Sequence, residues 1–78
     1  MITLQHFGRG LSWLRVPYSL LKQIDIQLRG IRYRSGDYIY LQDIADQYYF
    51  QDSLTQQGIQ FQVEQKPYAE VEQFIKQD

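Results

Sequence analysis

The chain has 78 residues, which is enough for one domain spanning residues 1–78. Leu, Ile, Val and Phe make up 23 of them, well above the level of about 20% below which chains tend to stay disordered. Cysteine is absent and His6 is the single histidine, so disulfides, thiolate metal sites and histidine-pair metal sites are excluded. The formal net charge of −1 predicts no bulk attraction to nucleic acid or to membranes.

The small net charge hides an uneven distribution along the chain. Residues 1–34 carry six cationic side chains and one carboxylate, whereas residues 35–78 carry two cationic side chains and eight carboxylates. If the two halves face each other in the fold, they partly neutralise each other. If they do not, the protein has a basic and an acidic face, and one face can steer an oppositely charged partner. The sequence leaves both interpretations open.

The first part of the chain predicts one strand and one ambiguous stretch. Ile2–Gln5 alternates apolar and polar residues, as a half-buried strand does, and glycines at residues 8 and 10 end this pattern. Leu11–Val16 fits either a short helix or an extra strand.

A helix is expected between Pro17 and Gly30. Proline just inside the start and glycine just past the end are the usual helix punctuation, and apolar residues recur at helical spacing from Leu21 to Leu28. A strand over residues 24–28 is the alternative, but it leaves this punctuation unexplained.

A β-hairpin is the clearest local prediction. Ile31–Arg34 and Tyr38–Leu41 are two alternating runs on either side of Ser35-Gly36-Asp37, where glycine can supply the positive φ of a tight turn. A second helix should follow the hairpin. Asp43 is its predicted N-cap, Asp46 lies in its first turn, and Gly58 ends it.

The last part of the chain predicts a strand and a short helix. Ile59–Glu64 alternates without a fault, and Pro67 then starts a helix in which Val71, Phe74 and Ile75 share one face. The resulting order, β-α-β-β-α-β with an added C-terminal helix, is typical of the ferredoxin-like split β-α-β fold. We therefore expect an α+β domain with a four-stranded antiparallel sheet.

The alternation also predicts which side chains share a face of that sheet. One set should face the helices: Ile2, Leu4, Ile31, Tyr33, Ile39, Leu41, Ile59, Phe61 and Val63. The other set should face away from them: Thr3, Gln5, Arg32, Arg34, Tyr38, Tyr40, Gln60, Gln62 and Glu64.

Two arginines and two tyrosines of the second set are the candidate binding residues: Arg32, Arg34, Tyr38 and Tyr40. Both residue types are enriched among residues that dominate binding energy, because they bury large areas while keeping polar groups. Two alternatives to a binding role stay open. Tyrosine is a good strand former on a half-exposed face, and the C-terminal helix could fold across this face.

The sequence gives little support for a catalytic site. His6 is the only histidine and is expected to be a structural hydrogen-bonding group. Asp43 and Asp46 are explained by helix capping, and Gly8-Arg9-Gly10 is not followed by the Gly-Lys-Ser/Thr of a phosphate-binding loop. We therefore expect no enzyme, no cofactor and no metal site.

Two partial resemblances point to nucleic acid. Residues 34–41 resemble part of the basic-aromatic octamer of RNA-recognition domains, which share the expected element order and stack bases on strand aromatics. The octamer's second glycine and final aromatic are missing. Residues 41–52 are similar to the first helix and turn of AraC-type helix-turn-helix proteins, but Tyr49 stands where that family has glycine, and Gly58 interrupts the expected recognition helix.

The sequence favours a small non-enzymatic module that binds another protein through its surface. In size and lack of catalytic motifs it is similar to the small inhibitors carried by phages and mobile elements, anti-CRISPR proteins among them. The alternative is a nucleic-acid-binding domain that uses the four candidate residues on an open sheet face. A homodimer is a further option. No signal peptide or membrane span is visible, so we expect a cytoplasmic protein without a membrane partner.

Overall fold

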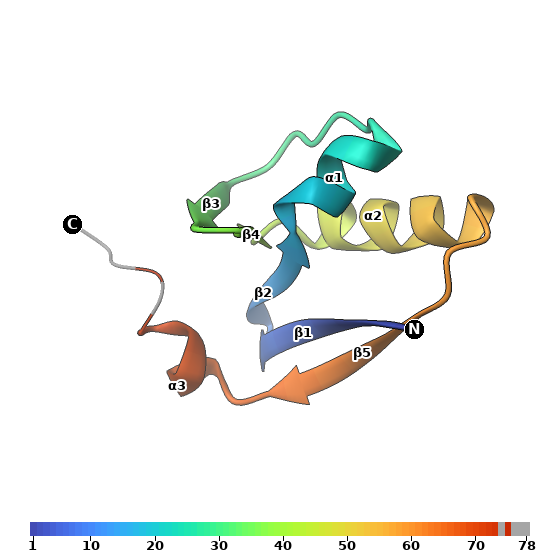
Figure 1. Ribbon diagram of the computed structural model, residues 1–78. Helices are drawn as coiled ribbons and strands as arrows, with labels where there is room; N and C mark the ends of the chain where they lie inside the picture. The colour runs from blue at the N-terminus through green and yellow to red at the C-terminus, as the bar shows by residue number, and fades with distance from the viewer. Residues whose placement is uncertain (74, 76–78) are drawn as a thin grey trace.

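In residues 1–73 and 75, the part of the chain that the computed structural model describes, five strands and three helices follow one another. Their order is β1 (Ile2–Arg9), β2 (Leu11–Pro17), α1 (Tyr18–Ile24), β3 (Arg32–Ser35), β4 (Tyr38–Leu41), α2 (Ile44–Gln56), β5 (Phe61–Lys66) and α3 (Tyr68–Val71) (Figure 1). The predicted α+β class is confirmed.

The strands form one five-stranded sheet in the order β3-β4-β2-β1-β5. Neighbouring strands are antiparallel except β1 and β5, which are parallel. The predicted four-stranded antiparallel sheet is therefore wrong. The added strand is β2, the stretch for which the sequence left helix and strand open. Gly8 and Gly10 have φ angles of 87° and 60°, and this left-handed backbone lets β2 return directly beside β1.

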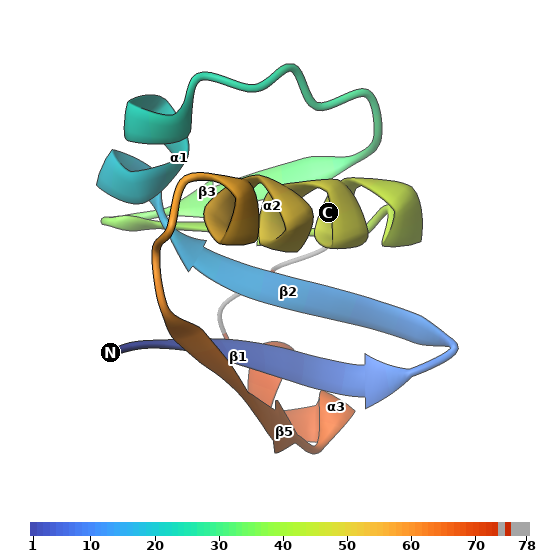
Figure 2. The ribbon, with the colours of Figure 1, turned by 90° about the vertical axis from the view of Figure 1, so that its right-hand side faces the viewer.

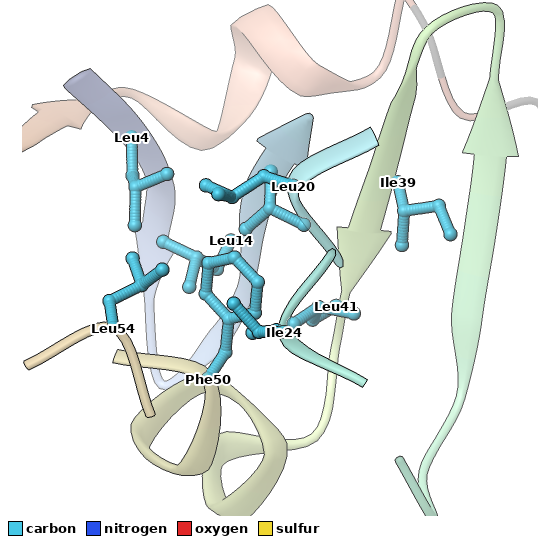
Figure 3. Close-up of a cluster of buried hydrophobic side chains, with 9 residues drawn as sticks. Leu4, Leu14, Leu20, Ile24, Ile39, Leu41, Phe50 and Leu54 are labelled. Carbon is cyan, nitrogen blue, oxygen red and sulfur yellow. The ribbon is translucent and has the colours of Figure 1, made fainter. Parts of the chain in front are cut away.

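Helices α1 and α2 cover one face of the sheet (Figure 2), and the main hydrophobic core lies between these helices and the strands (Figure 3). Leu4, Leu14 and Leu41 come from three different strands and are fully buried against Phe50 and Leu54 of α2. Burial of each such side chain contributes about 1.5–3 kcal/mol to stability. The predicted inward orientation of Leu4 and Leu41 is confirmed.

Helix α1 is shorter than the sequence predicts. It begins after Pro17, as expected, but ends at Ile24 instead of continuing towards Gly30. Asp25 adopts φ 50° and ψ 58°, a left-handed conformation that stops the helix. The chain between Asp25 and β3 is therefore an irregular segment, neither the predicted helix nor the alternative strand.

Helix α2 agrees with the prediction at both ends. The side chain of Asp43 accepts the backbone N–H of Asp46 at 3.1 Å, and the helix ends shortly before Gly58. Gln47 is buried in the middle of the molecule, and its Nε2 donates to the backbone carbonyl of Leu41 at 2.9 Å. This bond ties α2 to β4.

The predicted hairpin is confirmed as β3 and β4, with Gly36 at φ 60° in the turn. The predicted strand over residues 59–64 is found two residues later, as β5.

A second hydrophobic cluster lies on the sheet face opposite α1 and α2. Phe7 and Trp13 are directly paired on β1 and β2, and they pack with Tyr40 against Val71 of α3. The C-terminal helix therefore covers part of the face that the sequence left open. Phe74, which was predicted to share a helix face with Val71, lies outside the described residues.

Candidate functional site

The four predicted binding residues are divided between the two faces of the sheet. Arg32 is paired with Leu41 and Arg34 with Ile39, and directly paired residues of an antiparallel ladder project to the same side. Leu41 and Ile39 belong to the core under the helices. Both arginines therefore lie on the helix side of β3, and their predicted place on the opposite face is wrong.

The two tyrosines lie on the other face and differ in exposure. Tyr40 is only 1% exposed because α3 packs over it. Tyr38 remains 38% exposed, with the guanidinium carbon of Arg15 at 4.0 Å from its ring centre. Tyr33, which was predicted to face the helices, is paired with Tyr40 and packs against the same cluster. The structure thus does not bring the four candidates together, and their roles in binding stay predictions.

A groove of about 660 Å³ lies on the helix side of β3. Its lining comes from α1, from the irregular segment after α1 and from β3, which follow one another along the chain, and from Ile39 of β4. We call its aliphatic lining residues, Leu21, Ile26, Leu28 and Ile39, the apolar floor. The volume lies within the range of pockets that hold small molecules.

The charge of this groove is predominantly positive. Lys22 of α1, Arg29 of the irregular segment and Arg32 of β3 line it, against the single carboxylate of Asp25. Among the described residues one ion pair is present, and it lies on β5. The groove cations are therefore not paired with any described carboxylate of the acidic second half of the chain, which favours the interpretation that the protein has a separate basic face.

Arg34 adjoins the groove through Tyr18, the first residue of α1. Its guanidinium carbon lies 3.8 Å from the centre of the Tyr18 ring, and its Nε donates to the carbonyl of Gly36 at 3.2 Å. The ammonium of Lys22 lies 5.7 Å from the centre of the same ring. Two cationic side chains thus lie near the same aromatic ring on the border of the groove. We call Lys22, Arg29, Arg32 and Arg34, with the apolar floor between them, the basic groove.

The wall formed by residues 25–31 is held in place by α2. The carboxylate of Asp46 accepts the backbone N–H groups of Arg29 and Gly30, at 3.2 and 2.8 Å. Gly30 also packs so closely on the side chain of Asp43 that a Cβ atom at this position would overlap it. The two carboxylates expected only to cap α2 therefore also fix the segment that carries Arg29.

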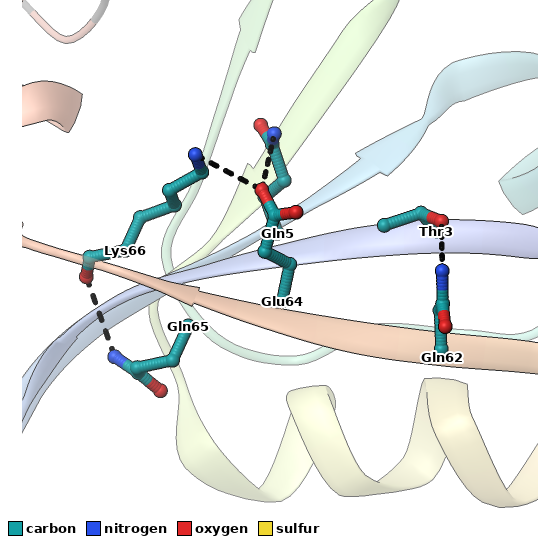
Figure 4. Close-up of polar contacts among 6 residues, drawn as sticks. All are labelled: Thr3, Gln5, Gln62, Glu64, Gln65 and Lys66. Atoms are coloured by element: carbon teal, nitrogen blue, oxygen red, sulfur yellow. Dashed lines mark hydrogen bonds and ion pairs between the residues drawn. The ribbon is translucent and has the colours of Figure 1, made fainter.

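A polar strip crosses β1 and β5 on the face opposite the groove (Figure 4). Gln62 donates to Thr3 at 2.8 Å, and Glu64 accepts from Lys66 at 3.0 Å and from Gln5 at 3.4 Å. The Lys66 ammonium lowers the pKa of Glu64, and the Glu64 carboxylate raises the pKa of Lys66. The two charges of this strip, on Glu64 and Lys66, are paired with each other, whereas the cations of the basic groove have no ion pair to a described carboxylate.

His6 has the structural role expected of it. Its Nδ1 lies 2.9 Å from Oε1 of Gln65, and Nε2 of the same glutamine donates to the carbonyl of Gly8 at 2.8 Å. Gln65 thus joins β5 to the end of β1.

Sequence reasoning missed the contributions of Lys22, Arg29 and Tyr18 to the groove. The close spacing of Arg29, Arg32 and Arg34 along the chain was the available signal, since no carboxylate separates them. The predicted helix up to Gly30 hid this signal, because the structure places Arg29 beside Arg32 on an irregular segment that begins where α1 ends, at Ile24.

Comparisons with protein-family models, curated proteins and solved structures find no match for this chain. Within the described residues, no group of three His, Cys, Asp or Glu side chains is arranged to hold a metal ion. None of the helices in that part of the chain is long and apolar enough to cross a membrane.

Proposed function

We propose that this chain is a non-enzymatic protein-binding module whose basic groove receives an acidic segment of another protein. The observation that carries the proposal is the gathering of Lys22, Arg29, Arg32 and Arg34 around an apolar floor, with no ion pair to any described carboxylate. Of the residues predicted to bind, Arg32 and Arg34 keep this role, and Tyr38 and Tyr40 are not part of the groove.

The groove offers two kinds of interaction to such a segment. Its cations attract carboxylates over several ångströms and raise the rate of encounter, an effect that weakens as salt rises. Its floor, which includes Leu28 and Ile39, can bury an apolar side chain of the partner. Occupancy of an acidic surface that the partner needs for its own activity would make the module an inhibitor, the class expected from its size.

The nucleic-acid alternative depended on arginines and tyrosines sharing one open face. Arg32 and Arg34 lie on the side opposite to Tyr38 and Tyr40, and Tyr40 is buried, so a base stacked on the tyrosines would not meet these arginines. Phosphate binding at the basic groove alone remains as an outcome of the experiment below.

The experiment is affinity capture followed by titration with three proteins: the wild type, Arg32→Glu and Arg9→Glu. Arg9 is an exposed arginine at the β1–β2 turn, outside the groove, and gives the matched charge reversal. For a captured protein partner we expect Arg32→Glu to weaken binding about tenfold or more, which is about 1.4 kcal/mol, and chiefly to slow association. Arg9→Glu should change it less than about twofold.

Equal effects of the two reversals would contradict a role of the groove. Capture of RNA with an affinity that falls steeply with salt would favour the nucleic-acid alternative, since each phosphate contact adds to that slope.

A further inference from the structure

The outer edge of β3 carries backbone groups that the sheet does not use. The N–H of Gln42 donates to the carbonyl of Ile31 at 3.1 Å, so these two residues, which directly flank β4 and β3, form a hydrogen-bonded position of the ladder. Bonded and non-bonded pairs alternate along an antiparallel ladder, which makes Tyr33 the next bonded position. Arg32, which lies between Ile31 and Tyr33, and Arg34, which follows Tyr33, are therefore non-bonded positions of the ladder. Their N–H and C=O groups therefore point away from β4.

Nothing in the described part of the chain pairs with these groups. β3 is the first strand in the sheet order, so it has a neighbour on one side only. The segment that precedes β3 leads away from the strand, back to α1 (Figure 1). No backbone hydrogen bond joins this segment to Arg32 or Arg34. An edge of this kind is a template for a further strand.

The same two residues supply two of the four cations of the basic groove. Their side chains project to the helix side of the sheet, where Arg32 lines the groove and Arg34 stacks on Tyr18. A chain added along β3 would alternate its side chains between that side and the side of Tyr33. The residues opposite Arg32 and Arg34 would then meet the guanidinium groups, which favours carboxylates at every second position.

We propose that the partner's acidic segment binds in extended form as a sixth strand on the outer edge of β3. Backbone hydrogen bonds to Arg32 and Arg34 would supply affinity, and alternate carboxylates beside their side chains would supply specificity. This inference rests on the proposed function and adds the conformation and register of the bound segment.

The opposite edge of the sheet does not offer the same combination. The N–H of Ile2 donates to the carbonyl of Gln60, so the outward positions of β5 are Phe61, Val63 and Gln65, none of which is charged. The cation of β5, Lys66, is already paired with Glu64. The amide of Val63 is therefore a matched control, since it lies on a free edge without free cations.

The test uses a blocked nine-residue peptide that alternates glutamate and valine, followed by NMR hydrogen exchange. Binding should slow the exchange of the Arg32 and Arg34 amides by about tenfold or more and leave the Val63 amide unchanged. Saturation with the peptide without protection of the two arginine amides would overturn strand addition. Protection of these amides in the free protein, together with a dimer in sedimentation, would also overturn it, because a second copy would then occupy the edge.

Two further peptides separate this inference from the proposed function. One is N-methylated at every glutamate and the other at every valine, which removes the amide hydrogens of one backbone edge at a time. An added strand donates from one edge only, so one peptide should lose binding about tenfold or more and the other should keep it. Equal effects of the two modifications would overturn strand addition. If instead the unmodified peptide binds wild type and Arg32→Glu equally, the proposed function itself fails.

Discussion

The carboxylate of Asp46 on α2 accepts the backbone N–H of Gly30 at 2.8 Å. This contact helps to hold the chain between α1 and β3, which is neither helix nor strand. Asp46 is 5% exposed, and its second oxygen accepts the N–H of Arg29 at 3.2 Å. A side chain of the acidic second half of the sequence thus positions a cation of the basic groove without forming an ion pair with it.

Replacement of this carboxylate should destabilise the protein. In Asp46→Ala the N–H groups of Arg29 and Gly30 lose their acceptor in a partly buried place, which costs about 1–3 kcal/mol. Urea unfolding measures this loss. Asp52→Ala, an exposed position on the same helix, is the control and should change stability by less than about 0.5 kcal/mol. A loss of the same size in both variants would mean that the contact does not hold the segment.

The two tyrosines of β4 should differ strongly when each is replaced by alanine. Tyr40 is 1% exposed between Phe7 and the residues of α3, so Tyr40→Ala leaves a cavity and should cost about 3–5 kcal/mol. Tyr38 is 38% exposed, and Tyr38→Ala should cost about 1 kcal/mol or less, through lost cross-strand contacts with neighbours such as Arg15. Denaturant unfolding of both variants under the same conditions measures the two losses of stability. The reverse order of losses would contradict the packing of α3 on β4.

The elements that depend on local signals could be predicted from the sequence. Gly36 between two alternating runs is enough for the hairpin, and Asp43 before Ile44 is enough for the start of α2, because turn and cap geometry involve neighbouring residues only. The end of α1 was not predictable in this way. The helix stops at the left-handed Asp25, and the chain beyond it is held by Asp46, which lies far along the sequence and accepts the N–H groups of residues 29 and 30.

The faces of the sheet were less predictable than its strands. Alternation correctly separates Tyr33 from Arg32 and Arg34, but it does not say which set faces which helix. Tyr33 looked like a core residue, and it does pack in a core, but that core lies under α3. The continuous apolar run of β4, Tyr38–Leu41, was the available sign that both faces of the sheet are covered, since strands buried on both faces show such runs.

The ion pair on β5 gives a prediction for pH dependence. The Lys66 ammonium lowers the pKa of Glu64, so the carboxylate's contribution to stability is present above the ordinary glutamate pKa of about 4.3 and is lost as the pH falls through the lowered value. The raised pKa of Lys66 gives the complementary limit: its contribution is present below about 10.4 and is lost as the pH rises through the raised value.

NMR titration of the Glu64 carboxyl group measures this effect directly. In Lys66→Met the pKa of Glu64 should rise towards the ordinary glutamate value, and in the wild type added salt should move it in the same direction because both groups are exposed to solvent. Arg9→Met removes a cation elsewhere and serves as the control. An unchanged Glu64 pKa in Lys66→Met would show that the pair does not persist in solution.

The packing of α3 on the sheet can be tested through Trp13, the only tryptophan of the chain. Its side chain is 4% exposed beside Val71, and its Nε1 is buried without a hydrogen-bond partner among the described residues. Val71→Asp would place a carboxylate in this apolar cluster, where a charge without a partner is strongly disfavoured, so α3 should separate from the sheet. Water would then reach Trp13, and its fluorescence emission should move to longer wavelength while the far-ultraviolet circular dichroism of α1 and α2 persists.

The control is Ala69→Asp, which adds the same charge at an exposed position of α3 and should leave the emission unchanged. A shift of equal size in both variants would contradict the packing of α3 on the sheet.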